Sequence, residues 1–250
     1  MRARPVAAAV LLTLGIAGCS GPLGPKYEYE EQLYLRVDGG ATVVVDASLP
    51  SLVALRGLVI DPDPRTRVDR QAIRRLYEDA GCTDVRVGQP WVRQRRHFIQ
   101  VRISTDDVRT LASCGPLAWS SYRFEKKDEV IYFWQHLGQA ANGTLPSVNW
   151  DGSEIVGVKL HLPSKILFHN VKRLKDGSNG EVDRGNILTY EQRLADRREG
   201  KPIDIEVRMG AKSILFQTLW LFGGAFVAAL ALLVTLIWLT VRRGRRQARA

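Results

Sequence analysis

Cys19 is the residue whose sequence context indicates the most specific chemistry. It follows Ile16-Ala17-Gly18, a lipobox pattern in which small residues let a signal peptidase approach and the thiol becomes a diacylglycerol thioether. The alternative is an ordinary signal peptide with a chance cysteine near its end. We predict lipidation at Cys19. Because each buried CH2 contributes about 0.8 kcal/mol, a multiply acylated cysteine would hold the chain at a membrane essentially permanently.

Cys82 and Cys114 are the two remaining cysteines, and both lie where a secretion signal would export them to a compartment that permits disulfides. A bridge between them would close a loop of about thirty residues and stabilise the fold by roughly 3 to 4 kcal/mol in the chain-entropy model. Two buried free thiols are the alternative. No CxxC or Cys/His spacing indicates a metal or redox site.

Signatures of the common enzyme classes are absent: the sequence contains no GxSxG, HExxH, P-loop or GxGxxG. His161 and His169 lie eight residues apart across Pro163, and neither has an acidic residue at metal-ligand spacing. We interpret them as ordinary strand and loop histidines. We therefore expect no catalytic residue, no metal and no cofactor, and an enzyme is disfavoured.

Four aromatic residues are candidates for binding lipid: Trp91, Trp119, Tyr132 and Trp134. They could line an apolar groove for acyl chains. The alternative is that each is simply core or sheet surface. Because alternate residues of a strand face opposite sides, only half of the run from Tyr132 to Trp134 can line any one cavity.

Both ends of the chain carry membrane signals. Residues 1–18 form a lipoprotein signal peptide, with Arg2 and Arg4 before an apolar stretch too short to span a bilayer. Residues 19–26 then form the lipidated N-terminus and a turn-rich linker.

No charged residue occurs from Ile214 to Val241, so residues 213–241 are predicted to form one transmembrane helix. A buried core helix is the alternative, but it would need a larger protein around it. Five arginines follow in the tail 242–250, and positive residues beside a spanning helix stay in the cytoplasm. We therefore place the main domain outside the cell (inner) membrane, lipid-anchored and single-pass.

The formal net charge of +10 becomes unremarkable once it is divided along the chain. The signal and the tail contain seven of the arginines, and the ectodomain has 29 basic and 26 acidic residues. This balance removes most of the case for a nucleic-acid partner.

Residues 27–210 are predicted to form one extracytoplasmic α+β domain, a mainly antiparallel sheet with two or three helices on one face. A hairpin is expected where the alternating segment from Tyr27 to Val37 turns through Asp38-Gly39-Gly40. Helices are expected from Leu49, with Pro50 in the first turn, and after the N-cap Asp69. Further strands are expected in six segments, of which 122–124 and 130–134 form a hairpin: 85–87, 98–103, 122–124, 130–134, 155–162 and 203–207.

The tethers at the two ends of the domain are short. Residues 20–26 and 208–213 each reach at most about 25 Å. If both Cys19 and the spanning helix are anchored in one membrane, the domain must sit close to it, and we expect its two termini to emerge on the same side.

The order of parts resembles the LppM-type (LppM domain) lipoproteins of actinobacteria. The resemblance rests on the lipobox, the spanning helix, the arginine tail and three segments between them: Val37-Asp38-Gly39-Gly40-Ala41-Thr42-Val43-Val44-Val45, Val158-Lys159-Leu160-His161-Leu162-Pro163 and Asn186-Ile187-Leu188-Thr189-Tyr190. It covers most of the chain, although the stretch from Asp61 to Trp150 matches no pattern of that family. The resemblance implies a noncatalytic envelope lipoprotein with an α/β domain that binds membrane lipids or glycolipids, and it transfers no binding residue.

Three classes of function therefore remain: a lipid or glycolipid binder at the membrane surface, an adaptor that scaffolds other envelope proteins, and an unrecognised envelope enzyme. The first leads. Membrane lipids are the expected partners, with envelope proteins as the alternative.

Overall fold

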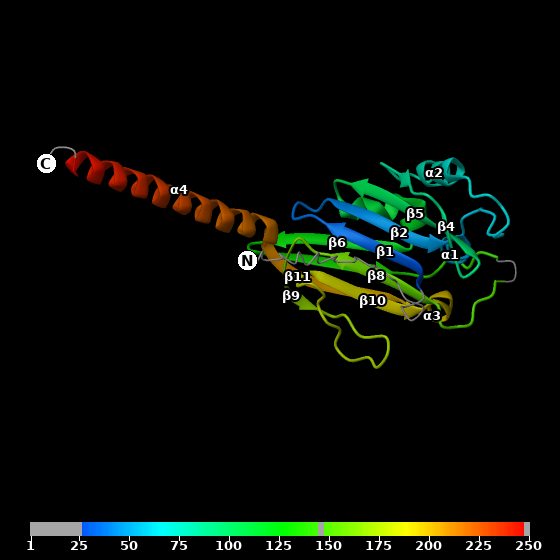
Figure 1. The fold of residues 1–250 in the computed structure, drawn as a ribbon. Coiled ribbons are helices and arrows are strands. Elements are labelled where there is room, and N and C mark those ends of the chain that lie inside the picture. The colour runs from blue at the N-terminus through cyan, green and yellow to red at the C-terminus, as the bar shows by residue number, and fades with distance from the viewer. Residues whose placement is uncertain (1–26, 145–147, 248–250) are drawn as a thin grey trace, which may run out of the picture.

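The computed structural model describes residues 27–144 and 148–247. The signal segment 1–18, the linker 19–26 and the predicted lipidation site Cys19 lie outside the described residues. The predicted α+β class with a mostly antiparallel arrangement is confirmed (Figure 1). The helix that follows the domain, α4 (Ile214–Gln247), contains a segment long and apolar enough to cross a membrane.

The larger sheet of the described part of the chain has seven strands. Their order is β10 (Ile187–Arg193), β8 (Ile155–His161), β1 (Tyr27–Leu35), β2 (Ala41–Ser48), β5 (Arg96–Thr105) and β3 (Arg86–Val87), with β4 (Trp91–Arg93) also paired to β5. The β1 and β8 strands run parallel, and the other pairs run antiparallel. Gly39 at φ +91° forms the β1–β2 turn, where Asp38 accepts a hydrogen bond from Gly40 N (2.9 Å).

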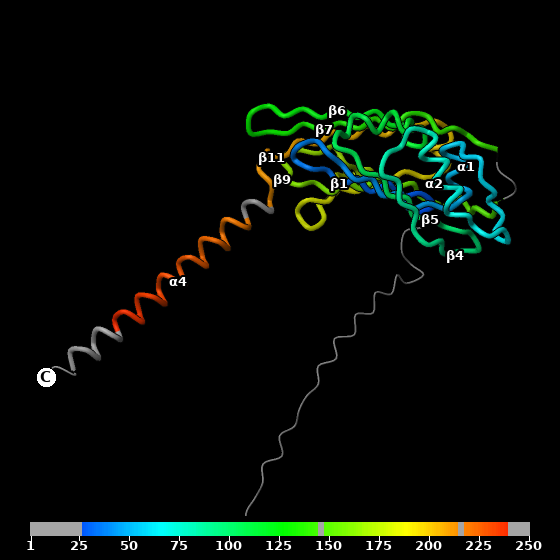
Figure 2. Tube along the Cα trace, turned by 90° about the horizontal axis from the view of Figure 1, so that it is seen from above, coloured from blue at the N-terminus to red at the C-terminus, as the bar shows by residue number. Residues whose placement is uncertain are grey.

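A second sheet packs on the first, where sequence reasoning expected helices. Its order is β6 (Ser120–Lys127), β7 (Val130–Leu137), β11 (Ile203–Ser213) and β9 (Ser164–His169). Figure 2 shows the two sheets as two layers. The core lies between them, because Leu33, Val45, Phe133 and Val207 are each at most 1% exposed and belong to one apolar cluster.

The helices cover the ends and edges of this sandwich. They are α1 (Leu49–Arg56), α2 (Arg70–Asp79), α3 (Leu194–Arg198) and two 3-10 helices, η1 (Val108–Ser113) and η2 (Gly115–Leu117). As predicted, Pro50 lies in the first turn of α1 and Asp69 caps α2 by accepting from Gln71 N and Ala72 N. Figures 1 and 2 place α1 and α2 at the end of the domain opposite α4.

The two termini of the domain do not emerge on the same side, so that prediction is wrong. Tyr27 begins β1, whereas α4 begins beyond the other end of β1: Ile214 N donates to Pro163 O, and nearby His161 pairs with Tyr34. Because a strand rises about 3.3 Å per residue, the length of β1 separates the two ends by roughly 26 Å. The two ends are apart because β1 runs toward the start of α4, and no local pattern records which end of β1 the last strand of the domain will reach.

Candidate functional site

The outer face of the four-stranded sheet carries the richest set of exposed functional groups. Its residues lie in cross-strand rows on β6, β7 and β11, set by the register of these strands. The first row is Ser121, His136 and Asp204. The second row is Arg123, Trp134 and Glu206, and the third row is Glu125, Tyr132 and Arg208. The intervening residues, such as Phe133 and Val207, point into the core.

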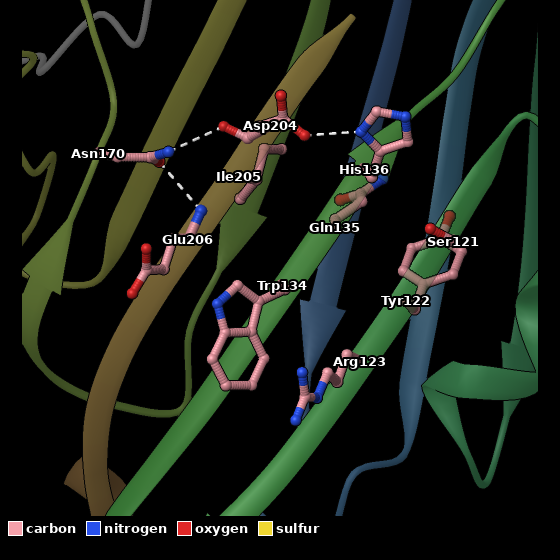
Figure 3. A pocket seen from close by; sticks show the side chains of 10 residues that line it. All are labelled: Ser121, Tyr122, Arg123, Trp134, Gln135, His136, Asn170, Asp204, Ile205 and Glu206. Carbon is pink, nitrogen blue, oxygen red and sulfur yellow. Dashed lines mark hydrogen bonds and ion pairs between the residues drawn. The ribbon is translucent and has the colours of Figure 1, made fainter.

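The first two rows enclose a hollow of about 360 Å³, a volume within the range of small-ligand sites. Figure 3 shows how the side chains surround it: Trp134 and His136 lie at opposite ends, Asp204, Asn170 and Glu206 along one side, and Ser121 and Arg123 along the other. Its lining therefore combines one indole ring with several donors and acceptors of hydrogen bonds.

Asn170, just after β9, fixes the acidic side of the hollow. Its Nδ2 donates to Asp204 O (2.9 Å), and its Oδ1 accepts from Glu206 N (3.0 Å) and from the Tyr190 hydroxyl (2.9 Å). The Asp204 side chain pairs with His136 Nδ1 (2.6 Å). These contacts hold the backbone in place while the Asp204 and Glu206 carboxylates remain accessible, with side-chain exposures of 71% and 31%.

Aromatic rings and cations lie side by side in the second and third rows. Tyr132 and Trp134 are stacked with ring centroids 5.8 Å apart, and the Arg123 guanidinium lies 4.8 Å from the Trp134 centroid. Arg208 lies 4.8 Å from the ring of Phe168 on β9. Such pairs are favourable and leave apolar ring surface beside charged groups. Hydrogen bonds from Lys127 and Arg123 hold the pKa of Glu125 below its usual range.

The four predicted aromatic candidates do not come together. Tyr132 and Trp134 share the outer face just described. Trp91 lies on the edge strand β4 of the other sheet, stacked on Phe98 at 5.7 Å, and Trp119 packs edge-on against Tyr29 at 5.5 Å. A single groove lined by all four is therefore not formed.

Cys82 and Cys114 are joined by a disulfide, as predicted. Both are buried. The bridge ties the segment after α2 to the end of η1 and so supports the edge of the larger sheet.

Sequence reasoning missed a buried charged group between the sheets. Glu31 is fully buried, and its carboxylate accepts from the Tyr29 hydroxyl (3.0 Å), Gln135 Nε2 (3.0 Å) and the Tyr122 hydroxyl (3.4 Å). Arg56 at the end of α1 is 3.5 Å away. Burial raises the pKa of Tyr29, which keeps its hydroxyl a donor. The available signal was that Glu31 falls on the apolar side of an alternating strand.

Arg56 has a second buried arginine, Arg197, as a neighbour at the Trp119 ring. The Arg56 guanidinium lies over the Trp119 ring, and Arg197 of α3 donates to the carbonyls of Leu137 and Gly138. Burial, and then the charge of Arg56, lowers the pKa of Arg197 to about 10. Within the described residues, the three nitrogens of the Arg56 guanidinium lack a hydrogen-bond acceptor. This centre therefore depends strongly on the Glu31 charge.

The row of Ser121, His136 and Asp204 has the residue types of a hydrolytic triad, so its geometry matters. A triad needs a hydrogen bond from serine to histidine and a buried aspartate that orients the imidazole. The structure has the His136–Asp204 contact, but within the described residues no hydrogen bond joins Ser121 to His136, and Asp204 is 71% exposed. This arrangement fits a binding surface better than a catalytic one.

No family model matches the sequence. No curated protein matches it either. Among solved structures, the chain is similar to the NMR structure of the folded domain of LppM from Mycobacterium tuberculosis, with a TM-score of 0.40 and 10% sequence identity, covering 75% of this chain and 92% of that chain. At that identity and TM-score the similarity assigns neither a ligand nor a site to this chain.

Proposed function

We propose that this chain is a membrane-anchored, noncatalytic envelope lipoprotein whose outer sheet face binds the sugar headgroup of an envelope glycolipid. The observation that carries the proposal is the hollow between Trp134 and His136, because its groups suit a carbohydrate. Sugar hydroxyls can donate to the Asp204 and Glu206 carboxylates and accept from Arg123, while the apolar face of a sugar ring can pack on an indole.

Membrane anchoring is supported by α4. Its apolar segment Thr218–Leu239 has 22 residues and a mean hydropathy of 2.3, and at about 1.5 Å per residue it would cover roughly 33 Å, close to the thickness of a bilayer core. Its apolar side chains are exposed, with Leu221 at 75% and Phe222 at 72%. A surrounding lipid bilayer would remove these apolar side chains from contact with water. Lipidation at Cys19 remains part of the proposal on the strength of its motif.

The order of the rows favours a glycolipid over a free sugar. The row with Tyr132, Arg208 and the adjacent Phe168 lies between the hollow and the start of α4. Asp204 is ten residues before Ile214, so the hollow is at most about 34 Å from the start of α4 along β11. A ligand whose headgroup occupies the hollow can therefore direct its apolar end along aromatic rings toward the membrane.

The test is mass spectrometry of lipids that stay bound to the full chain after mild-detergent extraction from its own envelope. We compare the parent with Trp134→Ala and Asp204→Asn, and use Tyr34→Ala as the matched control because Tyr34 is an exposed aromatic residue on β1 of the other sheet. Loss of a charged acceptor costs about 1.5 to 3 kcal/mol, so Asp204→Asn should lower ligand occupancy at subsaturating ligand by about tenfold or more. Tyr34→Ala should keep the parental level of bound lipid.

Three results would contradict the proposal. One is that no lipid is enriched with the parent. Another is that all three variants retain or lose it equally. A third is that Ser121 reacts with a fluorophosphonate and activity disappears in Ser121→Ala, which would make the same row catalytic. Copurification of an envelope protein that depends on Trp134 would instead favour the adaptor function.

A further inference from the structure

The excess positive charge of the ectodomain is confined to one segment. Residues 61–102 contain ten arginines and six carboxylates, a net charge of +4. The remainder of residues 20–213 contains nineteen basic and twenty acidic residues. The charge is therefore a local property of the surface formed by the loop before α2, α2 itself and the β4–β5 hairpin.

Within this segment some arginines are neutralised and others are not. Arg74, Arg86 and Arg96 form ion pairs with Glu78, Asp84 and Glu28. By contrast, no ion pair joins the side chains of the other seven to any described residue, and four of these seven, Arg65, Arg67, Arg70 and Arg95, line hollows of this surface. Unpaired surface cations retain their attraction for anions, so these four residues are the part of that charge that surrounds the hollows.

These four of the unpaired arginines line two neighbouring hollows. Arg67 and Arg70 line one of about 770 Å³ together with Val92 and His97. Arg65 and Arg95 line another of about 450 Å³. His97 Nε2 bonds to the carbonyl of Pro64 (2.9 Å), which connects the loop to the β4–β5 hairpin. Each hollow also has one carboxylate in its lining, Asp69 in the first and Asp63 in the second, so four arginines and two carboxylates meet at this place on the molecule.

Exposed apolar side chains accompany these charges. On the edge strand β4, Trp91 is 38% and Val92 62% exposed. We call the four arginines with Trp91 and Val92 the basic end. A tryptophan and an aliphatic side chain beside arginines match the composition of surfaces that enter the headgroup region of a membrane.

The basic end lies beside the first residue of the domain. Arg93, at the end of β4, donates a hydrogen bond to the carbonyl of Tyr27. The seven residues from 20 to 26 reach at most about 25 Å back toward Cys19. The start of α4 is at the other end of β1. If both ends of the domain are tied to one membrane, the basic end is therefore held near that membrane, away from the point where α4 enters.

We infer that the basic end is a second membrane contact that binds the anionic headgroup surface of the bilayer entered by α4. The domain then lies with its long axis along the membrane, supported at one end by α4 and at the other by arginine-headgroup contacts. The inference rests on the proposed function in two respects, that α4 spans the membrane and that Cys19 is lipidated, and it does not require glycolipid binding.

The test measures hydrogen exchange of the full chain in nanodiscs of phosphatidylglycerol and, separately, of phosphatidylcholine. Peptides covering residues 61–68 and 88–95 report on the basic end. Each arginine at an anionic membrane surface raises the equilibrium constant for membrane binding roughly fivefold. Exchange in these peptides should therefore slow by at least about fivefold in the anionic discs, and high salt should remove the difference.

Charge reversal provides the matched control. Arg67→Glu with Arg95→Glu should abolish the slowing, whereas Arg173→Glu with Lys175→Glu, an equal change of charge in the loop after β9, should preserve it. Equal exchange in the two kinds of disc, or equal effects of the two double variants, would overturn the inference. A chain that does not enter nanodiscs at all would instead refute spanning by α4 and hence the proposed function.

Discussion

Replacing Glu31 by glutamine removes the negative charge that stabilises Arg56 between the sheets. The two side chains are 0% and 2% exposed and lie 3.5 Å apart. The substitution preserves size and leaves Tyr29, Tyr122 and Gln135 beside a side chain that can still accept a hydrogen bond. Its main effect is therefore electrostatic.

The magnitude follows from the burial of both partners. Removing one member of a buried ion pair costs about 3 to 5 kcal/mol, because the other charge is left uncompensated in a medium of low dielectric constant. Arg197 raises the cost, since its charge already repels that of Arg56. For a domain of this size, about 1 kcal/mol changes the melting temperature by roughly 2 to 4 °C. We expect Glu31→Gln to lower it by about 6 to 20 °C.

Thermal unfolding of the full chain in mild detergent, followed by near-ultraviolet circular dichroism, measures this change. The decisive control is Glu31→Gln combined with Arg56→Met, which removes both charges and retains apolar contact with Trp119. This double variant should recover at least about 2 kcal/mol relative to Glu31→Gln alone. The reasoning fails if Glu31→Gln is within about 1 kcal/mol of the parent, or if the double variant is no more stable than the single one.

Three further predictions concern single residues or pairs. Alkylation of the unreduced, denatured protein should modify neither Cys82 nor Cys114, and replacing both by alanine should lower the free energy of unfolding by about 3 to 4 kcal/mol; quantitative labelling of both would refute the disulfide. Burial, and then the charge of Lys159, lowers the pKa of His161, so the unfolded chain binds the proton more readily and stability falls as pH decreases below the ordinary value of about 6.5. The melting temperature of His161→Gln should therefore fall less than that of the parent between about pH 7.5 and about pH 5, and equal falls would count against the shift. Metabolic labelling with a palmitate analogue should disappear in Cys19→Ala, and undiminished labelling would show that Cys19 is not the lipidated residue.

Local patterns were enough to predict several elements, because their causes lie within a few residues. Asp38-Gly39-Gly40 contains both the residue that can adopt φ +91° and the side chain that accepts from the turn, so the β1–β2 hairpin is encoded in the segment itself. Asp69 likewise caps α2 through its own carboxylate. The uncharged run in α4 likewise indicates a helix that can cross a membrane without reference to the rest of the chain.

Tertiary structure alone decided how distant segments meet. The second sheet pairs β7 with β11, about seventy residues later, and that register places Trp134 opposite Glu206 and His136 opposite Asp204. Glu31, Arg56 and Arg197 come from a strand and two helices, and only close packing of the two sheets brings their charges together. Periodicity reports which side of a strand is apolar, but it does not report which strand becomes the neighbour. The apolar helix, the turns and the caps were therefore readable in the sequence, whereas the hollow, the buried charges and the separation of the two termini depend on long-range pairing.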